Sequence, residues 1–228
     1  MQAILLAAGK GVRMRPATLK TPKPLLLVHN KTILEHVLDA LPPEIDEIIL
    51  VVNYLHGQIR THIGDRHNSI PISYLIQDPL TGTAGALFLA QHMLRERFLV
   101  LNADNIYDPK SLEELLQYDQ SLLVIKTQHS LAASVKSTNG HFAGLEPCVH
   151  PPCLLVCGAY VLNQSFFQLS PVEIYVGSHT EFGLPQTLVQ SSQPIQLVTT
   201  TRWFPIGIPE ELTHASLCLQ KHTVHKTT

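Results

Sequence analysis

Two glycines and several basic side chains follow the first apolar segment of the chain. Residues 1–8 are apolar apart from Gln2 and end in two alanines, and Gly9 and Gly11 come next. Because glycine lacks a Cβ, its backbone amide can approach an anion closely. Four cationic side chains lie in the same short span: Lys10, Arg13, Arg15 and Lys23. This combination predicts a loop that binds a polyphosphate.

Two common phosphate-binding loops do not match this stretch. A P-loop requires Gly-Lys followed by Ser or Thr, whereas Gly11 follows Lys10 here. The dinucleotide-binding fingerprint requires a third glycine at the position of Met14. The loop must therefore belong to another class, or be a simple glycine turn with solvated basic residues.

The spacing resembles the signature of the sugar-nucleotidyltransferases, which is Gly-x-Gly-x-Arg, then a Pro and a Thr, then Pro-Lys-Pro-Leu. The matching residues are Gly9, Gly11, Arg13, Pro16, Thr18, Pro22, Lys23, Pro24 and Leu25. A simple glycine turn would not account for the later lysine. The resemblance implies catalytic roles for Arg13, on the departing pyrophosphate, and Lys23, on the α-phosphate and the attacking phosphate. It also implies a nucleotide-binding set that begins with Leu6, Ala8, Gly9 and Gly11.

Apolar runs and helical patterns alternate along the first half of the chain. Strands are expected at 47–53, 70–76, 97–104 and 122–126, and helices at 32–41, 58–63, 86–95 and 110–119. This alternation predicts a Rossmann-like three-layer α/β/α fold with a mostly parallel central sheet. Shorter strands at 132–135, 142–145 and 154–162, with a turn at Asn139-Gly140, predict a small β-rich insertion on the substrate side.

The remaining elements complete a single domain over residues 1–228. A helix is expected from Thr180 to residue 188, a strand at 195–199 and a closing helix at 210–219. We expect residues 1–108 to form the nucleotide-binding half and residues 109–228 the sugar-phosphate half.

A strand that ends at Gln77 turns through Pro79 and Gly82 into a helix. This arrangement presents an amide side chain and free backbone groups at the carboxyl edge of the sheet, where they can read a flat pyrimidine ring. The alternative is a helix start with small residues for close packing. The resemblance implies that Gln77, Gly82 and Thr83 hold uracil or thymine.

Asp104 follows another strand at the same edge. A carboxylate beside phosphate oxygens is a natural ligand for Mg²⁺, which takes one or two carboxylates and completes its shell with phosphate and water. Asp104 could instead cap the helix that begins near Pro109, but Asp108 is better placed for that role. The family has a metal-binding Asp at this position, so the resemblance implies Asp104 as the metal ligand and Mg²⁺ as the cofactor.

The second half departs from the family at two positions. The resemblance implies that Asn105, Gly144, Glu146 and Tyr160 contact the sugar phosphate. However, the lysine that the family commonly has after this glutamate is absent, because Pro147 follows Glu146. Pro205 stands where the family has its second metal-binding carboxylate. Glu181 and Glu210 are candidate substitutes without direct support.

Composition excludes several other classes of protein. The 228 residues carry a formal net charge of −2, so no strong field favours nucleic acid or an anionic membrane. The first apolar run is too short for a signal peptide or a membrane span, and we expect a cytoplasmic protein.

The four cysteines are expected to be reduced thiols. A zinc site at Cys148, His150 and Cys153 is disfavoured against packed thiols and a proline-rich turn, because Cys157 lies inside an apolar run.

The predicted reaction joins UTP or dTTP to a sugar 1-phosphate and releases pyrophosphate. It needs no general base, because the attacking phosphate is already ionised at neutral pH. One alternative is a CTP-dependent enzyme that acts on phosphocholine, since the lysine after Glu146 is missing. Another is a noncatalytic subunit that binds nucleotide or sugar phosphate, since Pro205 removes a carboxylate. The sugar and the oligomeric state, including a homo-oligomer, stay open.

Overall fold

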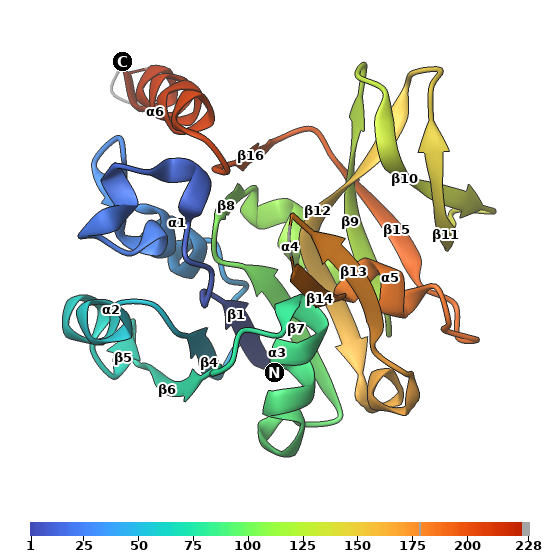
Figure 1. The fold of residues 1–228 in the computed structure, drawn as a ribbon, viewed down its shortest axis with the longest axis horizontal. Coiled ribbons are helices and arrows are strands. Elements are labelled where there is room, and N and C mark those ends of the chain that lie inside the picture. The colour runs from blue at the N-terminus through green and yellow to red at the C-terminus, as the bar shows by residue number, and fades with distance from the viewer. Residues whose placement is uncertain (178, 225–228) are drawn as a thin grey trace.

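The computed structural model describes residues 1–177 and 179–224 and contains one large sheet between helices (Figure 1). The strands of this sheet are β1 (Gln2–Leu6), β4 (Glu47–Val52), β5 (Arg66–His67), β6 (Ile70–Ile76), β7 (Arg97–Asn102), β9 (Ser121–Thr127), β10 (Leu131–Thr138), β11 (His141–Cys148), β12 (Cys153–Asn163) and β15 (Gln196–Thr200). Their spatial order is β10-β11-β15-β9-β12-β7-β1-β4-β6-β5. All of them run in one direction except β5, β11 and β12. The predicted α/β fold with a mostly parallel central sheet is confirmed.

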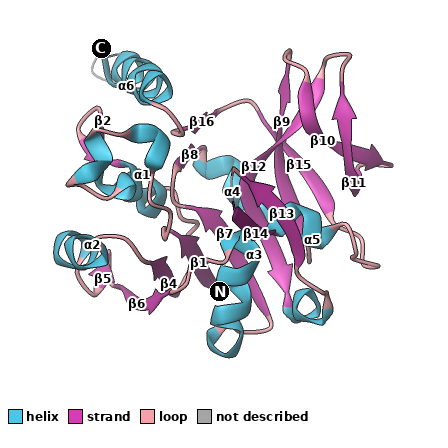
Figure 2. Ribbon diagram, in the orientation of Figure 1, coloured by secondary structure: helices cyan, strands magenta, loops and turns pink. Residues whose placement is uncertain are grey.

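Side chains of the central strands alternate between two buried faces, as the period of a β-strand requires. Along β1, Ala3 and Leu5 join one buried cluster and Ile4 joins the other. The first cluster contains side chains of α1 (Ile33–Asp39), α2 (His56–Ile63) and α4 (Pro109–Leu115). The second contains side chains of α3 (Gly82–Ala90) and α5 (Leu184–Leu188). Helices therefore cover both faces of the sheet, which gives the three expected layers (Figure 2).

Side-chain caps fix where two of these helices begin. Thr32 and Glu35 form a reciprocal capping box at the start of α1. The Asp108 side chain accepts a hydrogen bond from the Ser111 backbone N–H at the start of α4. Such a cap is worth about 1 kcal/mol. Because Asp108 fills this role as predicted, Asp104 is left for another.

The closing helix α6 (Pro209–Val224) lies against the beginning of the chain. A third buried cluster joins Met14 of the first loop to Ile206 and to Ala215 of α6. Four short strands complete this region: β2 (Leu27–Val28), β3 (Lys31–Thr32), β8 (Asn105–Tyr107) and β16 (Trp203–Pro205). Strand β16 pairs with β8, directly after Asp104. The last part of the chain therefore returns to the first loop.

Two hairpins shape the second half. Asn139 and Gly140 have φ values of 51° and 79° and turn β10 into β11, which confirms the predicted turn. The expected helix from Thr180 is wrong in its first residues. Strand β13 (Val172–Val176) pairs with β14 (His179–Gly183), and the helix begins only at Leu184, with Pro185 in its first turn. Proline is favoured at a helix start because that N–H has no partner within the helix.

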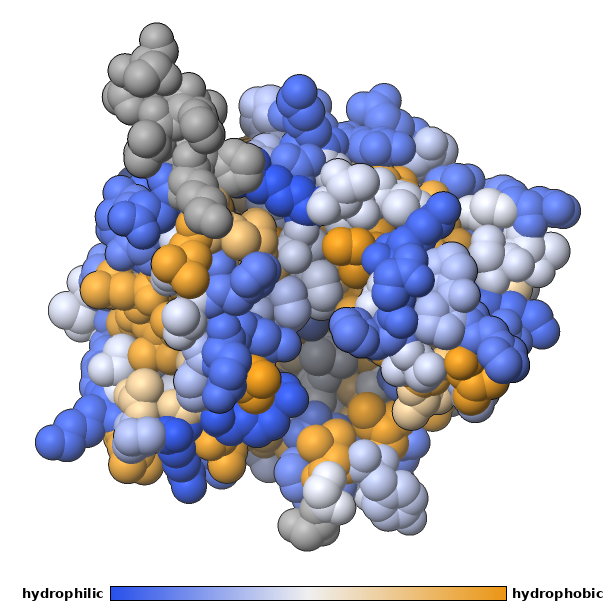
Figure 3. Space-filling view, turned by 90° about the horizontal axis from the view of Figure 1, so that it is seen from above, coloured by the Kyte–Doolittle hydropathy of each residue, from blue (hydrophilic) through white to orange (hydrophobic). Residues whose placement is uncertain are grey.

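Figure 3 views the molecule from above Figure 1, the side on which α6 and β16 lie. The surface is hollowed near its middle, between the part that carries α6 and the β-rich second half. Among the described residues, no helix is both long and apolar enough to cross a membrane.

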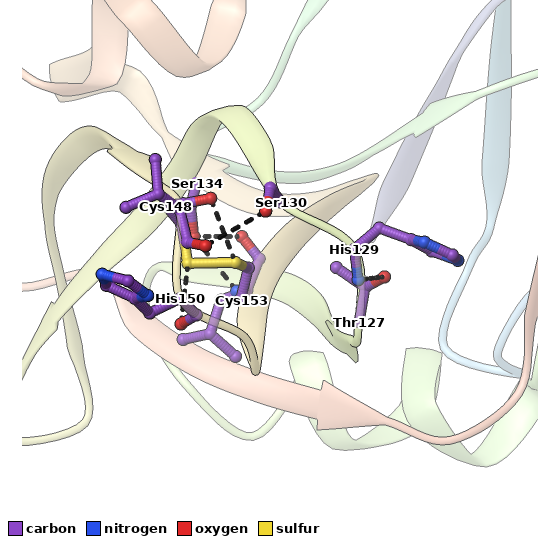
Figure 4. Close-up of a disulfide and its surroundings, with 9 residues drawn as sticks. Thr127, His129, Ser130, Ser134, Cys148, His150 and Cys153 are labelled. Atoms are coloured by element: carbon purple, nitrogen blue, oxygen red, sulfur yellow. Dashed lines mark hydrogen bonds between the residues drawn. A yellow bond between two sulfur atoms is a disulfide. The ribbon is translucent and has the colours of Figure 1, made fainter.

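The expectation of four reduced thiols is wrong. Cys148 and Cys153 form a disulfide at the connection between β11 and β12 (Figure 4). Five positions separate them, and the intervening turn contains a cis Pro151–Pro152 peptide bond. Cys157 and Cys218 are free. The bond closes the proline-rich turn, so the cysteine and histidine pattern there does not form a zinc site.

Breaking this disulfide is expected to destabilise the chain moderately. Chain-entropy arguments give about 2 kcal/mol for a closed loop of this length. Cys148→Ser should therefore lower the thermal midpoint by about 4–8 °C under oxidising conditions. Cys218→Ser, which removes a free thiol, is the control. Equal midpoints for the unsubstituted chain and Cys148→Ser would show that the bond does not stabilise the fold.

Candidate active site

The first loop and Asp104 leave the sheet side by side. Strand β1 pairs with β7 in parallel, with Leu6 opposite Asn102. The Ala103 backbone N–H donates to the Leu6 carbonyl over 3.1 Å, which continues the pairing past both strand ends. The carboxyl edge of a parallel sheet is where ligands bind in this architecture. The structure therefore brings the glycine loop and the predicted metal ligand to one place.

Lys23 and Asp104 form an ion pair at this edge. The Lys23 Nζ lies 2.6 Å from Asp104 Oδ2. The side chain of Lys23 is 9 % exposed and that of Asp104 is 43 % exposed. The Ile206 backbone N–H donates to the Asp104 carbonyl and holds its backbone from the other side. A buried ammonium thus faces a carboxylate that solvent and a ligand can still reach.

The two loop glycines meet different surroundings. Gly11 has a φ of 60°, and a Cβ there would lie 2.9 Å from Lys23 Cβ. The Thr18 hydroxyl donates to the Gly11 carbonyl over 2.7 Å and tightens the loop. A Cβ at Gly9 would meet no atom within 4 Å. Gly11 therefore allows Lys23 to pack closely, whereas the space beside Gly9 is open.

A cavity of about 230 Å³ opens beside Asp104. It is lined by Arg13, Asn102, Asp104, Asn105, Val156, Cys157, Gly158, Trp203, Pro205, Ile206, Gly207 and Glu211. Two of the three predicted catalytic side chains, Arg13 and Asp104, line this cavity, and the third, Lys23, is bonded to Asp104. We call it the Asp104 cavity.

A bulge in β12 forms one wall of the Asp104 cavity. The register of β12 against β9 shifts between Val156 and Tyr160, and Gly158 has a φ of 73°. A Cβ on Gly158 would lie 2.5 Å from Asn102 Nδ2, so only glycine fits there. Burial raises the pKa of the Cys157 thiol well above its ordinary value. That thiol therefore stays neutral at physiological pH.

Buried hydrogen bonds fix the floor beside this wall. The Tyr107 hydroxyl lies 2.9 Å from the Gly158 carbonyl and 3.0 Å from the Asn102 carbonyl. Burial also raises the pKa of Tyr107, which keeps its hydroxyl protonated as a donor. The Asn105 amide donates to the Tyr107 hydroxyl and to the Cys157 carbonyl. Asn105 lines the cavity, but its NH₂ group is already used within the protein.

Two polar atoms in the residues around the cavity have no partner. Asn102 Oδ1 and Trp203 Nε1 are buried and make no hydrogen bond within the described residues. Such atoms are rare in folded proteins and call for an explanation such as a bound molecule or water. The sequence interpretation missed both, and it also missed Glu211. Asn102 was signalled only by its place at the strand end before Asp104, and Trp203 only as the aromatic residue two positions before Pro205. Glu211 had no sequence signal.

The predicted base-reading segment lies at another strand end. The Gln77 side chain is buried, and its Nε2 donates to Thr81 Oγ1 and to the Gly82 carbonyl, each over 3.0 Å. A Cβ at Gly82 would lie 2.7 Å from the Phe182 carbonyl, and the Thr83 hydroxyl accepts from the Leu184 N–H. A separate cavity of about 300 Å³ is lined by Gln77, Asp78, Pro79, Thr81, Gly85, Phe88, Leu89, Pro171 and Phe182. It shares no residue with the Asp104 cavity.

Three of the predicted sugar-phosphate residues do not line the Asp104 cavity. Tyr160 is buried in the apolar cluster on the α3 face, where burial raises the pKa of its hydroxyl. Glu146 is exposed and lies 3.7 Å from Lys136 Nζ. Gly144 is buried with a φ of 128°. The structure thus brings only Asn105 of this set to the cavity.

The residues at this site fit a Mg²⁺ ion whose ligands would come mostly from the phosphates of the substrate. Asp104 supplies one accessible carboxylate, and Pro205 has no side-chain oxygen to offer. Across residues 1–177 and 179–224 no three His, Cys, Asp or Glu side chains cluster. Of the suggested substitutes, Glu181 pairs with His179 and Glu210 is exposed, and neither lines the cavity. Mg²⁺ needs only one or two protein carboxylates when phosphates complete its shell.

Residues 2–133 match the family model of the nucleotidyl transferases. The chain belongs to this family. The match covers more than half of the chain and includes the glycine loop, Gln77 and Asp104, so the resemblance predicted from these motifs is confirmed. The nucleotidyl transferase model ends before most of the β-rich second half, where the chain departs from the family pattern.

Individual relatives of this nucleotidyl transferase differ in how much they share with it. The UTP–glucose-1-phosphate uridylyltransferase AglF of Haloferax volcanii is 29 % identical over an alignment 243 positions long, which covers 100 % of both chains. The bifunctional protein GlmU of Methanococcus maripaludis strain C5 is 33 % identical over 129 residues. That match covers 57 % of this chain but 30 % of GlmU, so the chain spans less than a third of the length of this relative.

Solved structures show the same fold. A Bacillus anthracis protein assigned as a glucose-1-phosphate thymidylyltransferase superposes with a TM-score of 0.79 at 21 % identity, over 96 % of this chain and 95 % of that one. A UDP-glucose pyrophosphorylase in complex with UDP-glucose gives a TM-score of 0.77 at 17 % identity, over 97 % and 98 %. At these identities the likeness establishes the nucleotidyl transferase fold alone.

Proposed function

We propose that this nucleotidyl transferase joins UTP or dTTP to a sugar 1-phosphate and releases pyrophosphate. The observation that carries the proposal is the meeting of three groups at one sheet edge. Arg13 and Asp104 line one cavity, and Lys23 is bonded to Asp104. The family match and the full-length likeness to AglF support the same reaction.

In this proposal the protein aligns two anions and neutralises their charge, which is most of what phosphoryl-type transfer requires. An oxygen of the sugar phosphate attacks the α-phosphorus of the triphosphate, and the bond to the pyrophosphate oxygen breaks. The amides of Gly9 and Gly11 cradle the triphosphate, Arg13 holds the departing pyrophosphate, and Lys23 faces the α-phosphate. When bound, Mg²⁺ on Asp104 neutralises further phosphate charge.

The hydrogen bonds of Gln77 support uracil or thymine over cytosine. The Gly82 carbonyl can only accept, so it fixes the orientation of the Gln77 amide. Both N–H groups of Nε2 are used by Thr81 and Gly82, which leaves Oε1 as an acceptor. Uracil and thymine carry a ring N3–H that can donate to it, whereas N3 of cytosine is itself an acceptor.

Base selectivity follows as a test. With a sugar 1-phosphate as acceptor, UTP or dTTP should give a kcat/KM at least about a hundredfold above that for CTP, because cytosine has an acceptor at ring N3, and its one donor, the exocyclic amino group, lies at a different position. Pyrophosphate release from a panel of triphosphates measures this ratio. GTP belongs in the panel, since guanine also has a ring N–H. Equal rates with CTP would contradict the role of Gln77.

The lining of the Asp104 cavity also supports a sugar over phosphocholine. A quaternary ammonium is usually held by a cage of aromatic rings. Here Trp203 is the single aromatic side chain in the described lining, and Arg13 adds a positive charge. Phosphocholine and several sugar 1-phosphates should therefore be compared as acceptors.

Both halves expected from the sequence contribute residues to the proposed site. Residues 1–108 supply the proposed nucleotide contacts, and residues 109–228 supply the β12 wall and the β16–α6 turn of the cavity.

A noncatalytic binding role would give triphosphate binding without pyrophosphate release for any acceptor in the presence of Mg²⁺. That result would refute the proposed reaction.

A further inference from the structure

Glu211 lies in the first turn of α6 and reaches back over the preceding turn. Its Oε2 accepts hydrogen bonds from the backbone N–H groups of Gly207, over 2.5 Å, and Ile208, over 3.2 Å. A glutamate three positions into a helix commonly makes such bonds as part of a helix cap. The cap alone would explain why the side chain of Glu211 lies here, so any further role needs a second observation.

The second observation is the place of Arg13, which lies beside Gly207 as Glu211 does. A Cβ built on Gly207 would lie 3.0 Å from Glu211 Oε2 and 3.2 Å from Arg13 Nη2. The carboxylate and the guanidinium are therefore at most about 6 Å apart, close enough for their opposite charges to attract each other at a protein surface. Both also line the Asp104 cavity.

One of the two carboxylates that line the cavity has a cationic partner among the described residues, and the other does not. Asp104 and Glu211 are the carboxylates in the described lining of the cavity, and Asp104 is bonded to Lys23. Among the described residues, Arg13 makes no hydrogen bond or ion pair. Glu211 is thus the carboxylate left to balance the charge of Arg13.

The backbone next to Arg13 is fixed to the same segment. Met14 is 2 % exposed and packs in the cluster that contains Ile206 and Ala215, just before and within α6. Arg13 itself is exposed. The loop backbone is therefore anchored on the β16–α6 segment. The side chain of Arg13 is not packed, so nearby charges decide its orientation.

We propose that the negative charge of Glu211 positions Arg13 toward the triphosphate site, which makes the closing helix part of that site. This inference rests on the proposed function, in which Arg13 binds the departing pyrophosphate. Glu211 is a positioning residue, because its carboxylate is already held by two backbone N–H groups and it acts through Arg13.

The test separates charge from capping. Glu211→Gln keeps an oxygen that can accept from Gly207 and Ile208 but removes the charge. We expect its thermal midpoint to stay within about 2 °C of the unsubstituted chain, and its affinity for UTP with Mg²⁺, measured by calorimetry, to fall about fivefold. Glu210→Gln, at the exposed neighbouring position, should bind UTP normally.

A double-mutant cycle gives the decisive comparison. In an Arg13→Ala background, Glu211→Gln should cause no further loss of UTP affinity. An equal loss in both backgrounds, unchanged binding, or tighter binding from the removal of a repelling charge would each overturn the inference. If the unsubstituted chain binds no nucleoside triphosphate, the proposed function itself fails, which the first titration shows before any variant is made.

Discussion

Asp104→Asn is expected to lower turnover at least about a hundredfold and to leave the fold intact. The asparagine keeps an oxygen that can accept from Lys23 Nζ, now 2.6 Å from the carboxylate, but it loses the negative charge. In the proposed reaction that charge holds the divalent ion against the phosphates. A hundredfold loss corresponds to about 2.7 kcal/mol of transition-state stabilisation, the usual size for one such electrostatic contact.

The choice of asparagine over alanine follows from the burial of Lys23. Asp104→Ala would leave an ammonium group, on a side chain 9 % exposed, without its partner. An unsatisfied buried group of this kind costs about 1–3 kcal/mol of stability. We therefore expect the alanine variant to lose thermal stability as well as turnover, whereas the asparagine variant loses mainly turnover.

Steady-state pyrophosphate release and thermal unfolding of both variants check this expectation. Asp108→Asn is a suitable control, since it changes the same carboxylate four residues away, at a helix cap. Near-normal turnover in Asp104→Asn would remove Asp104 from the reaction. Equal stability of the alanine and asparagine variants would show that Lys23 finds another partner or reaches solvent.

The sequence predicted the fold well where local patterns decide it. The apolar runs at 47–53 and 70–76 form β4 and β6 within a residue, and β7 begins at Arg97 as expected but ends at Asn102, two residues before Asp104. A strand buried on both faces must be apolar along its whole length, so its sequence is distinctive. Gly9 and Asp104 were placed at strand ends for the same reason, and parallel pairing then brings those ends together.

The errors occurred where distant segments decide the local structure. Residues 179–183 form a strand because β13 pairs with them, which nothing within those five residues reveals. Tyr160 was assigned to the sugar phosphate, but the bulge at Gly158 shifts the register of β12, and the ring lies in the core. Because side chains alternate along a strand, one such shift decides which face a residue meets.

The missed part of the site has the same origin. Glu211 and Trp203 reach the Asp104 cavity because β16 pairs with β8 and because α6 packs on Met14. The first of these contacts joins residues about 100 positions apart and the second joins residues about 200 positions apart, so no motif spacing can encode them. The Cys148–Cys153 disulfide also depends on the path of the chain, here through the turn between β11 and β12.

Arg13→Ala is the second change with a large expected effect. Arg13 is exposed on the first loop and lines the cavity that contains Asp104, and it makes no hydrogen bond within the described chain that stabilises the fold. Its loss should therefore leave the thermal midpoint unchanged. In the proposed reaction it stabilises the charge that develops on the departing pyrophosphate, so we expect turnover to fall at least about a hundredfold.

Lys20→Ala is the matched control for this prediction. Lys20 is exposed in the same loop region and lines neither cavity, so its removal changes the net charge equally without touching the site. If Arg13 acts only through the general positive field of the loop, both variants should lose activity to a similar, small extent, and added salt should reduce the difference. A large loss confined to Arg13→Ala, and persisting at high salt, requires direct contact between the guanidinium and a substrate phosphate, because screening weakens a distant charge far more than a hydrogen-bonded one.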